Sequence, residues 1–121
     1  SYFHSKDLQN SWICIDFVDN QIIPNSYEIK SYPYATNDQH PKSWVIEVSN
    51  DNSSWFIVDE INNCSYLNGR SVSHTFKIKN ETSQKFRYMR MRLTGPNWLG
   101  KNSLAIKSFE VYGTLLLHDE S

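Results

Sequence analysis

The sequence lacks most of the features that mark enzymes and membrane proteins. It has only four glycines in 121 residues, and it contains no glycine-rich phosphate loop, no Gly-x-Ser-x-Gly turn and no His-Glu-x-x-His motif. No apolar run approaches the roughly 18 residues needed to cross a bilayer, and the first residues do not resemble a signal peptide. These absences predict a non-catalytic domain and disfavour a membrane partner. The missing signal favours a cytoplasmic over an extracellular location.

An excess of charge of one sign is missing as well. Lysine and arginine total 12 against 13 acidic residues, which gives a formal net charge of -1. Because nucleic-acid-binding domains usually carry a strongly basic face, we expect no nucleic-acid partner. The length and the 39% hydrophobic residues suit one globular domain with a single core. We expect residues 1–121 to be one domain excised from a longer protein, monomeric in isolation.

Cysteine is scarce and lacks metal-binding spacing. Cys14 and Cys64 stand far apart, outside any Cys-x-x-Cys pair, and we expect both to be reduced thiols, as in cytosolic proteins. Cys64, a possible nucleophile, and His40, a possible base, lie in loops that we expect at the same end of the domain. No third group that would orient the base is identifiable, so an enzyme using this pair is a remote alternative.

The sequence has many aromatic residues, 14% of the total, and apolar residues recur at every second position. In the segment 43–50, for example, Trp44, Ile46 and Val48 alternate with more polar residues. Such alternation is typical of half-buried strands. Turn-forming residues separate the alternating segments. The pattern predicts an all-β sandwich or barrel, with strands in the segments 12–19, 22–32, 43–50, 54–62, 71–79, 86–92 and 104–113.

The expected strand directions sort the connections into two groups. If successive strands run antiparallel, the long segments fall at one end: the residues before Trp12 and the loops 34–42, 62–71 and 95–103. The shorter turns 19–26, 50–54 and 80–85 fall at the opposite end. Since loops held by a rigid scaffold commonly carry binding functions, the end with the long loops is the candidate site.

Several ordered motifs together resemble the discoidin, or coagulation factor V/VIII type C, family of galactose-binding-like domains. They are Trp-x-x-Ile-Asp-Phe at 12–17, the segment 43–55, Phe-Arg-Tyr-Met-Arg-Met-Arg at 86–92, the Pro-x-Trp turn at 96–98 and the segment 104–113. The resemblance covers roughly residues 12–115. It implies an eight-stranded jelly roll whose loops at one end bind sugars, phospholipid head groups or proteins.

The sequence departs from that family in two respects. Its cysteines lie at positions 14 and 64, whereas extracellular members commonly carry one near each terminus. Compared with that family, we also expect part of the usual N-terminal region, with its first strand, to be absent. Both departures look more like the discoidin-like domains of intracellular multidomain proteins.

The arginines at 87, 90 and 92 suggest either an anion-binding stripe or the polar outer side of a strand. On a strand, Met89, Met91 and Leu93 form one row, and Arg90 and Arg92 share the opposite row with Phe86 and Tyr88. Too few basic residues lie on the neighbouring segments to extend a stripe, so we expect a structural role, with ion pairs to carboxylates such as Glu47 or Glu110.

The candidate ligand-binding residues are the aromatic and polar residues of the long loops. Trp12, Trp44 and Trp55 are expected in the core or closing its ends, whereas Trp98, after a Gly-Pro-Asn turn, either stacks on a ligand or folds back over the end of the sandwich. The complete set of candidate ligand-binding residues is Tyr34, Asn37, Asp38, His40, Tyr66, Asn68, Arg70, Asn97, Trp98 and Lys101.

The expected function is recognition of a protein partner or a carbohydrate without catalysis. No cofactor is expected. A calcium-assisted lectin, with Asp38 contributing to the calcium site, or a binder of phospholipid head groups is the alternative.

Overall fold

The computed structural model describes residues 3–4, 9–33 and 39–117, and within them every regular element is a strand. This confirms the predicted all-β class. The eight strands are β1 (Phe3–His4), β2 (Trp12–Asp16), β3 (Asn20–Ser31), β4 (Trp44–Ser49), β5 (Phe56–Ile61), β6 (Ser73–Lys77), β7 (Tyr88–Leu93) and β8 (Ala105–Leu117).

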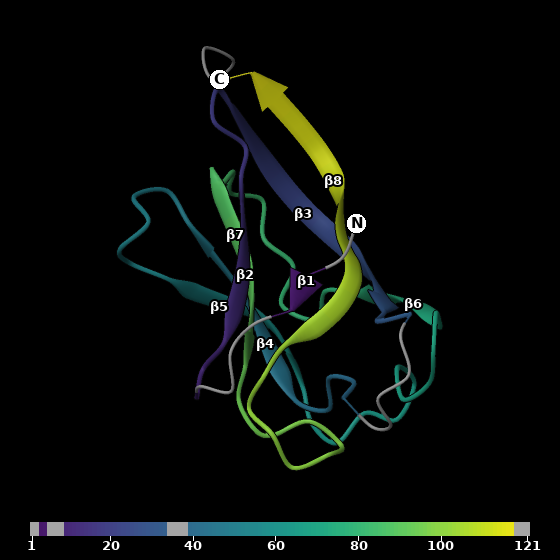
Figure 1. The fold of residues 1–121 in the computed structure, drawn as a ribbon. Coiled ribbons are helices and arrows are strands. Elements are labelled where there is room, and N and C mark those ends of the chain that lie inside the picture. The colour runs from purple at the N-terminus through teal and green to yellow at the C-terminus, as the bar shows by residue number, and fades with distance from the viewer. Residues whose placement is uncertain (1–2, 5–8, 34–38, 118–121) are drawn as a thin grey trace.

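The strands form two four-stranded antiparallel sheets packed as a sandwich (Figure 1). One sheet has the order β1-β8-β3-β6 and the other β2-β7-β4-β5. Apart from the β4–β5 hairpin, neighbouring strands are distant in the sequence: β3, for example, pairs with β8, and β4 pairs with β7. This crossed order agrees with the jelly-roll architecture expected from the sequence.

The alternating apolar residues form the core between the sheets. Trp44, Ile46 and Val48 of β4 and Met89 and Met91 of β7 are fully buried in one cluster. Each such side chain stabilises the fold by about 1.5–3 kcal/mol relative to remaining in water. The period-2 pattern in the sequence therefore correctly predicts which rows face inward.

A chain of hydrogen bonds crosses this core and joins the two sheets. The hydroxyl of Tyr27, on β3, donates to Oδ2 of Asp59, on β5, at 2.5 Å. The indole Nε1 of Trp44, on β4, donates to the same hydroxyl at 3.1 Å. Burial and the bond to Asp59 raise the pKa of Tyr27 far above its ordinary value. The phenol therefore stays protonated and remains a donor.

The arginines lie on the outer side of the second sheet, as expected. Nε of Arg90 and Nε of Arg92 both donate to Oε1 of Glu47, at 3.0 and 2.8 Å. The predicted pairing with Glu47 is confirmed, whereas Glu110 accepts a hydrogen bond from Tyr112 instead. Arg90 also lies 3.8 Å from the ring centroid of Trp55. The stripe is therefore part of the scaffold.

Three aromatic residues differ from expectation. Trp12 is 52% exposed rather than buried, and its ring flanks the Arg90 guanidinium at 5.9 Å. Trp55 is half-buried, with its ring centroid 3.8 Å from the same guanidinium. Phe86 belongs to the core rather than to the arginine row, because it precedes β7 and pairs with Ile22 of β3 in an isolated bridge.

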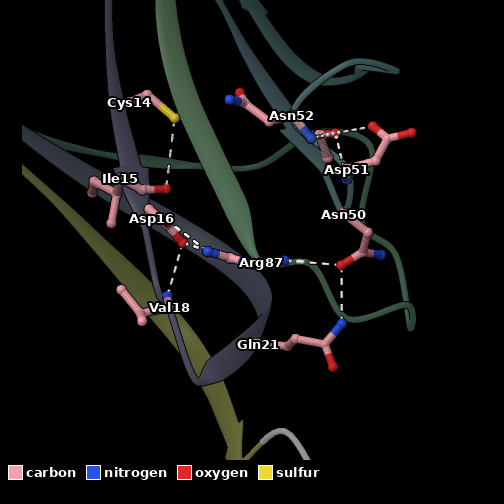
Figure 2. Close-up of polar contacts among 10 residues, drawn as sticks. Cys14, Ile15, Asp16, Val18, Gln21, Asn50, Asp51, Asn52 and Arg87 are labelled. Atoms are coloured by element: carbon pink, nitrogen blue, oxygen red, sulfur yellow. Dashed lines mark hydrogen bonds and ion pairs between the residues drawn. The ribbon is translucent and has the colours of Figure 1, made fainter.

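The short turns meet at one end, where side chains tie them together (Figure 2). Oδ1 of Asn50 accepts hydrogen bonds from Nε2 of Gln21 at 2.9 Å and from the backbone N–H of Arg87 at 3.0 Å. The Arg87 guanidinium pairs with Asp16. The predicted turn at 19–26 is wrong in extent, because β3 begins at Asn20 and the Pro24–Asn25 signal marks a bulge inside it.

Gly113 on β8 faces this bulge, which generates the first prediction. A Cβ atom there would meet the carbonyl oxygen of Ile23 and lie 2.9 Å from Cα of Pro24, so backbone would have to shift. We expect Gly113→Ala to lower the free energy of unfolding by about 1–3 kcal/mol, measured by urea denaturation. Gly95→Ala is the control, because its Cβ would have 3.9 Å of clearance. Equal effects of the two substitutions would contradict the assignment.

Glu47 generates a prediction about pH. Burial opposes its ionisation, but hydrogen bonds from Arg92 and Arg90 outweigh that cost and lower the pKa of Glu47. A lowered folded-state pKa means that the carboxylate stabilises the fold above its unfolded-state pKa and loses this effect as the pH falls through the folded value. Glu47→Gln should therefore cost about 1–3 kcal/mol at neutral pH.

The difference between Glu47→Gln and wild type should shrink below about pH 4. Urea denaturation of both proteins across the acidic range measures it. A difference that does not depend on pH would show that packing, rather than charge, accounts for the effect.

Candidate functional site

The described long loops, 62–71 and 95–103, lie with the segment 39–43 at the end of the sandwich opposite the short turns, as the alternation of strands predicts (Figure 1). Backbone bonds hold them together: the N–H of Cys64 donates to the Lys42 carbonyl at 2.8 Å, and that of Thr94 to the Ser43 carbonyl at 3.1 Å. Oγ of Ser43 also accepts the N–H of Asn63 at 3.0 Å. The segment 42–43 thus binds the loops 62–71 and 94–103 on its two sides.

Asn97 shapes the loop that contains it. Its buried Oδ1 accepts the backbone N–H groups of Leu99 and Lys101, each at 3.0 Å, and its Nδ2 donates to the Ser103 carbonyl at 3.3 Å. The side chain therefore satisfies backbone groups of its own loop, a role typical of asparagine in turns. The predicted ligand-binding residue Asn97 is a structural element of this end.

Trp98 folds back against the loop end, in line with one of the two expectations for it. The residue is half-buried, and Nζ of Lys42 lies 4.6 Å from its ring centroid, so a cation covers one face of the indole. Lys101 is exposed beside it. Trp98 thus contributes mainly packing, while Lys101 presents a charge to solvent.

The loop 62–71 presents the exposed aromatic ring of this end. Tyr66 is 61% exposed, and its ring lies 4.5 Å from the imidazole of His74, which in turn lies 4.5 Å from the ring of Phe76. The neighbouring Leu67 is fully buried and anchors the loop. Of the predicted residues, Tyr66, Asn68 and Arg70 are exposed together on this loop.

A cavity of about 370 Å³ opens beside Tyr66. Polar groups of Asn62, Asn63 and Ser65 lie on one side of it, and Lys79 and Phe76 line it from the β6 region. Nζ of Lys79 is held by the Glu60 carbonyl at 2.6 Å. We call this site the Tyr66 pocket. Sequence reasoning found Tyr66 and named Cys64 as a remote catalytic candidate, but it missed the other lining residues, for which the only signal was the polar run at 62–65.

Other predicted residues do not join this pocket. His40 is buried, so its imidazole is a packing group and not a solvent-facing one. Tyr34, Asn37 and Asp38 lie outside the described residues. Cys14 and Cys64 are both free thiols, as expected.

The described part of the chain has neither a cluster of metal-ligating side chains nor a membrane-spanning helix. No group of three or more histidine, cysteine or acidic side chains is placed to hold a metal ion there. Nor does that part contain a helix long and apolar enough to span a membrane.

Residues 4–115 match the family model described as Sad1/UNC-like C-terminal. The chain belongs to this family. The galactose-binding-like fold expected from the discoidin resemblance is confirmed, but membership of the factor V/VIII type C family itself is not supported by a match. No curated protein sequence matches the chain significantly.

Solved structures similar to this Sad1/UNC-like domain include carbohydrate-binding modules and a lectin domain. The module CBM62 of Xyl5A from Clostridium thermocellum has a TM-score of 0.65 at 18% identity, over 89% of this chain and 71% of its own. A CBM32 module from Clostridium perfringens, in complex with GalNAc-beta-1,3-galactose, has a TM-score of 0.67 at 14% identity, over 93% of this chain and 76% of its own.

The lectin domain of lectinolysin, in complex with Lewis B antigen, has a TM-score of 0.66 at 14% identity, over 92% of this chain and 70% of its own. At these identities the likeness establishes the fold of the domain and leaves its ligand to be argued from its own residues.

Asn97 generates a prediction about the loop end. Asn97→Ala removes the acceptor of two backbone N–H groups and should lower the free energy of unfolding by about 1–3 kcal/mol, with increased amide hydrogen exchange at residues 97–103. Urea denaturation measures the free energy of unfolding and hydrogen exchange with mass spectrometry measures the loop, and Asn68→Ala, at an exposed position of a neighbouring loop, is the control. Unchanged exchange in Asn97→Ala would show that the backbone holds the loop without the amide.

Proposed function

We propose that this Sad1/UNC-like domain is a non-catalytic recognition module that binds a glycan in the Tyr66 pocket. The observation that carries the proposal is the exposed tyrosine ring beside a cavity lined by amides, a hydroxyl and an ammonium group. An aromatic ring with a few convergent polar groups is the usual composition of a small-ligand site.

The Tyr66 ring is placed to stack on a sugar. Its packing against His74 restrains the ring, while most of the residue remains exposed to solvent. The apolar C–H face of a pyranose packs well on such a ring. The side chains of Asn62, Asn63 and Ser65 offer donors and acceptors for the hydroxyls, and Lys79 adds a donor. A volume of about 370 Å³ suits a mono- or disaccharide.

The similar structures support a glycan as the ligand class. One holds GalNAc-beta-1,3-galactose, one holds Lewis B antigen, and another is described as a fucose-binding module of Streptococcus pneumoniae. In this chain Asn68 and Arg70, exposed near Tyr66, would contact sugar units beyond the pocket. A protein partner contacting the same loop through Tyr66 and Arg70 is the alternative, because tyrosine and arginine dominate protein interfaces.

The absence of catalysis is part of the proposal. The Tyr27 phenol is held protonated in the core, and burial raises the pKa of the Cys14 thiol and makes it a poor nucleophile. Cys64 lines the Tyr66 pocket, but its predicted partner His40 is buried. We further propose that the domain binds its ligand without a cofactor and that the protein is cytoplasmic. A calcium ion held in part by Asp38, which would assist ligand binding, is the alternative.

A glycan array with the isolated domain tests the proposed function. Binding to a defined sugar should weaken about tenfold or more in Tyr66→Ala, which corresponds to about 1.4 kcal/mol of lost stacking. Phe56→Ala is the matched control, because Phe56 is 60% exposed but lies beyond the Tyr66 pocket, at the other end of β5. Isothermal titration with the best sugar gives the affinities.

Two outcomes would contradict the proposal that the ligand is a glycan. An array on which the domain binds no sugar would rule out a glycan ligand. Equal losses in Tyr66→Ala and Phe56→Ala would place the ligand elsewhere. A protein captured by wild type but not by Tyr66→Ala would support the alternative partner at the same loop.

A further inference from the structure

The outer face of the second sheet carries a row of side chains that crosses its four strands (Figure 1). Cys14 of β2 pairs with Arg90 of β7, and Glu47 of β4 pairs with Arg90 on the other side. Glu47 in turn pairs with Ile57 of β5. Paired residues share one face of an antiparallel sheet, and the methionines of β7 occupy the core-facing side. The row therefore lies on the outside of the sandwich.

Arg90, at the centre of this row, is held in place by its neighbours. Its Nε donates to Oε1 of Glu47 at 3.0 Å, and its Cζ lies 3.8 Å from the ring centroid of Trp55. The ring of Trp12 lies 5.9 Å from the same guanidinium. A guanidinium is attracted to the face of an aromatic ring and stacks on it. The orientation of the group is therefore set by the fold before any partner binds.

The two terminal nitrogens of Arg90 are not used by the fold. Neither makes a hydrogen bond with a described residue, since Nε alone donates to Glu47. Both reach solvent, because neither belongs to the buried polar atoms that lack a partner. The N–H groups of a guanidinium lie in one plane, and two parallel groups match the two oxygens of a carboxylate. The tip of Arg90 is therefore an open site for a carboxylate.

The charges around Arg90 favour such a partner. Arg90 and Arg92 both donate to Glu47, so two guanidiniums share one carboxylate and one positive charge is in excess. The other acidic residue of these rows, Glu60, lies on β5, two strands from Arg92, and hydrogen-bonds with neither arginine. A second carboxylate at Arg90 would balance the excess charge and accept its terminal N–H groups.

Aromatic and aliphatic side chains surround this charged group. Trp12 is 52% exposed and Ile57 is 48% exposed, while Trp55 and Tyr88 are half-buried beside each other. Tryptophan, tyrosine and arginine are the side chains most enriched in the energetic centres of protein interfaces. They are spread here across the face of a sheet. This composition fits a protein partner that carries apolar residues next to its carboxylate.

We propose that the outer face around Arg90 binds a protein segment that presents a glutamate or aspartate side chain flanked by apolar residues. The carboxylate accepts hydrogen bonds from the terminal nitrogens of Arg90, and the flanking apolar side chains pack on Trp12 and Ile57. These residues differ from those of the Tyr66 pocket, so this surface is independent of the proposed function.

Two matched peptide arrays test the proposal. Each peptide of the first array has a glutamate at its centre between varied apolar residues, and in the second array glutamine replaces that glutamate. Wild type should bind members of the first array. The dissociation constant of the best peptide, measured by isothermal titration, should rise about tenfold or more when its glutamate is replaced by glutamine. Added salt should also weaken binding, because the contact joins opposite charges.

Variants of the face separate the carboxylate contact from the apolar contact. Arg90→Lys keeps the charge but loses the planar pair of donors, and Trp12→Ala removes an exposed ring. Each should weaken peptide binding about tenfold or more. Tyr112→Ala, at an exposed aromatic residue of the first sheet, is the control, and Tyr66→Ala should also bind the peptide as wild type does. Circular dichroism confirms that each variant is folded.

The indole N–H resonances of the tryptophans locate the contact by NMR. The best peptide should shift the resonances of Trp12 and Trp55, which lie against Arg90, and leave that of the buried Trp44 unchanged. Arrays without binding, equal binding to the glutamine peptides, or shifts that omit both outer tryptophans would overturn the proposal. Binding to phosphatidylserine vesicles without binding to any peptide would overturn it in favour of a lipid.

Discussion

The two sheets are held at one spacing by a hydrogen-bonded chain in which Tyr27 is the central member. Its hydroxyl accepts from Trp44 and donates to Asp59, so the three side chains fix strands β3, β4 and β5 relative to one another. A buried carboxylate is tolerated only where such partners satisfy it. Apolar packing alone would permit small shifts between the sheets, whereas these bonds have a direction and specify one arrangement.

The same chain reaches the candidate site. Asp59 also accepts the backbone N–H of Lys79 at 3.3 Å and lies 3.7 Å from its ammonium group. Lys79 in turn lines the Tyr66 pocket. The wall of the pocket therefore takes its position from the core, and the exposed side chains of loop 62–71 complete the site above it.

Much of the fold follows from the sequence, because alternation records which side chains avoid water. The rows of β4 and β7 and the two groups of loops were predicted correctly for this reason. Trp12 was misplaced because alternation does not distinguish a core row from an outer row covered by arginine. The bulge at Pro24 was read as a turn, since the same residues favour both and only the pairing with β8 decides between them.

The site was less predictable. Tyr66, Asn68 and Arg70 could be proposed because they lie in one loop, but Phe76 and Lys79 reach the pocket from a segment that appears purely structural in sequence. His40 and Asn97 are buried rather than exposed to solvent, because polar loop residues can point inward; Asn97 does so to satisfy backbone groups of its own loop. Whether such a side chain points inward or toward solvent depends on the path of the loop backbone, which the sequence pattern does not give.

Different residues of the loops hold their shape and face solvent, and this separation has an evolutionary consequence. Ser43 and Asn97 hold the shape of the loop end through backbone bonds, whereas the exposed residues at 66, 68 and 70 make few contacts that the fold needs. Substitutions at these exposed positions cost little stability. These exposed positions can therefore change during evolution while the framework of the loop end persists.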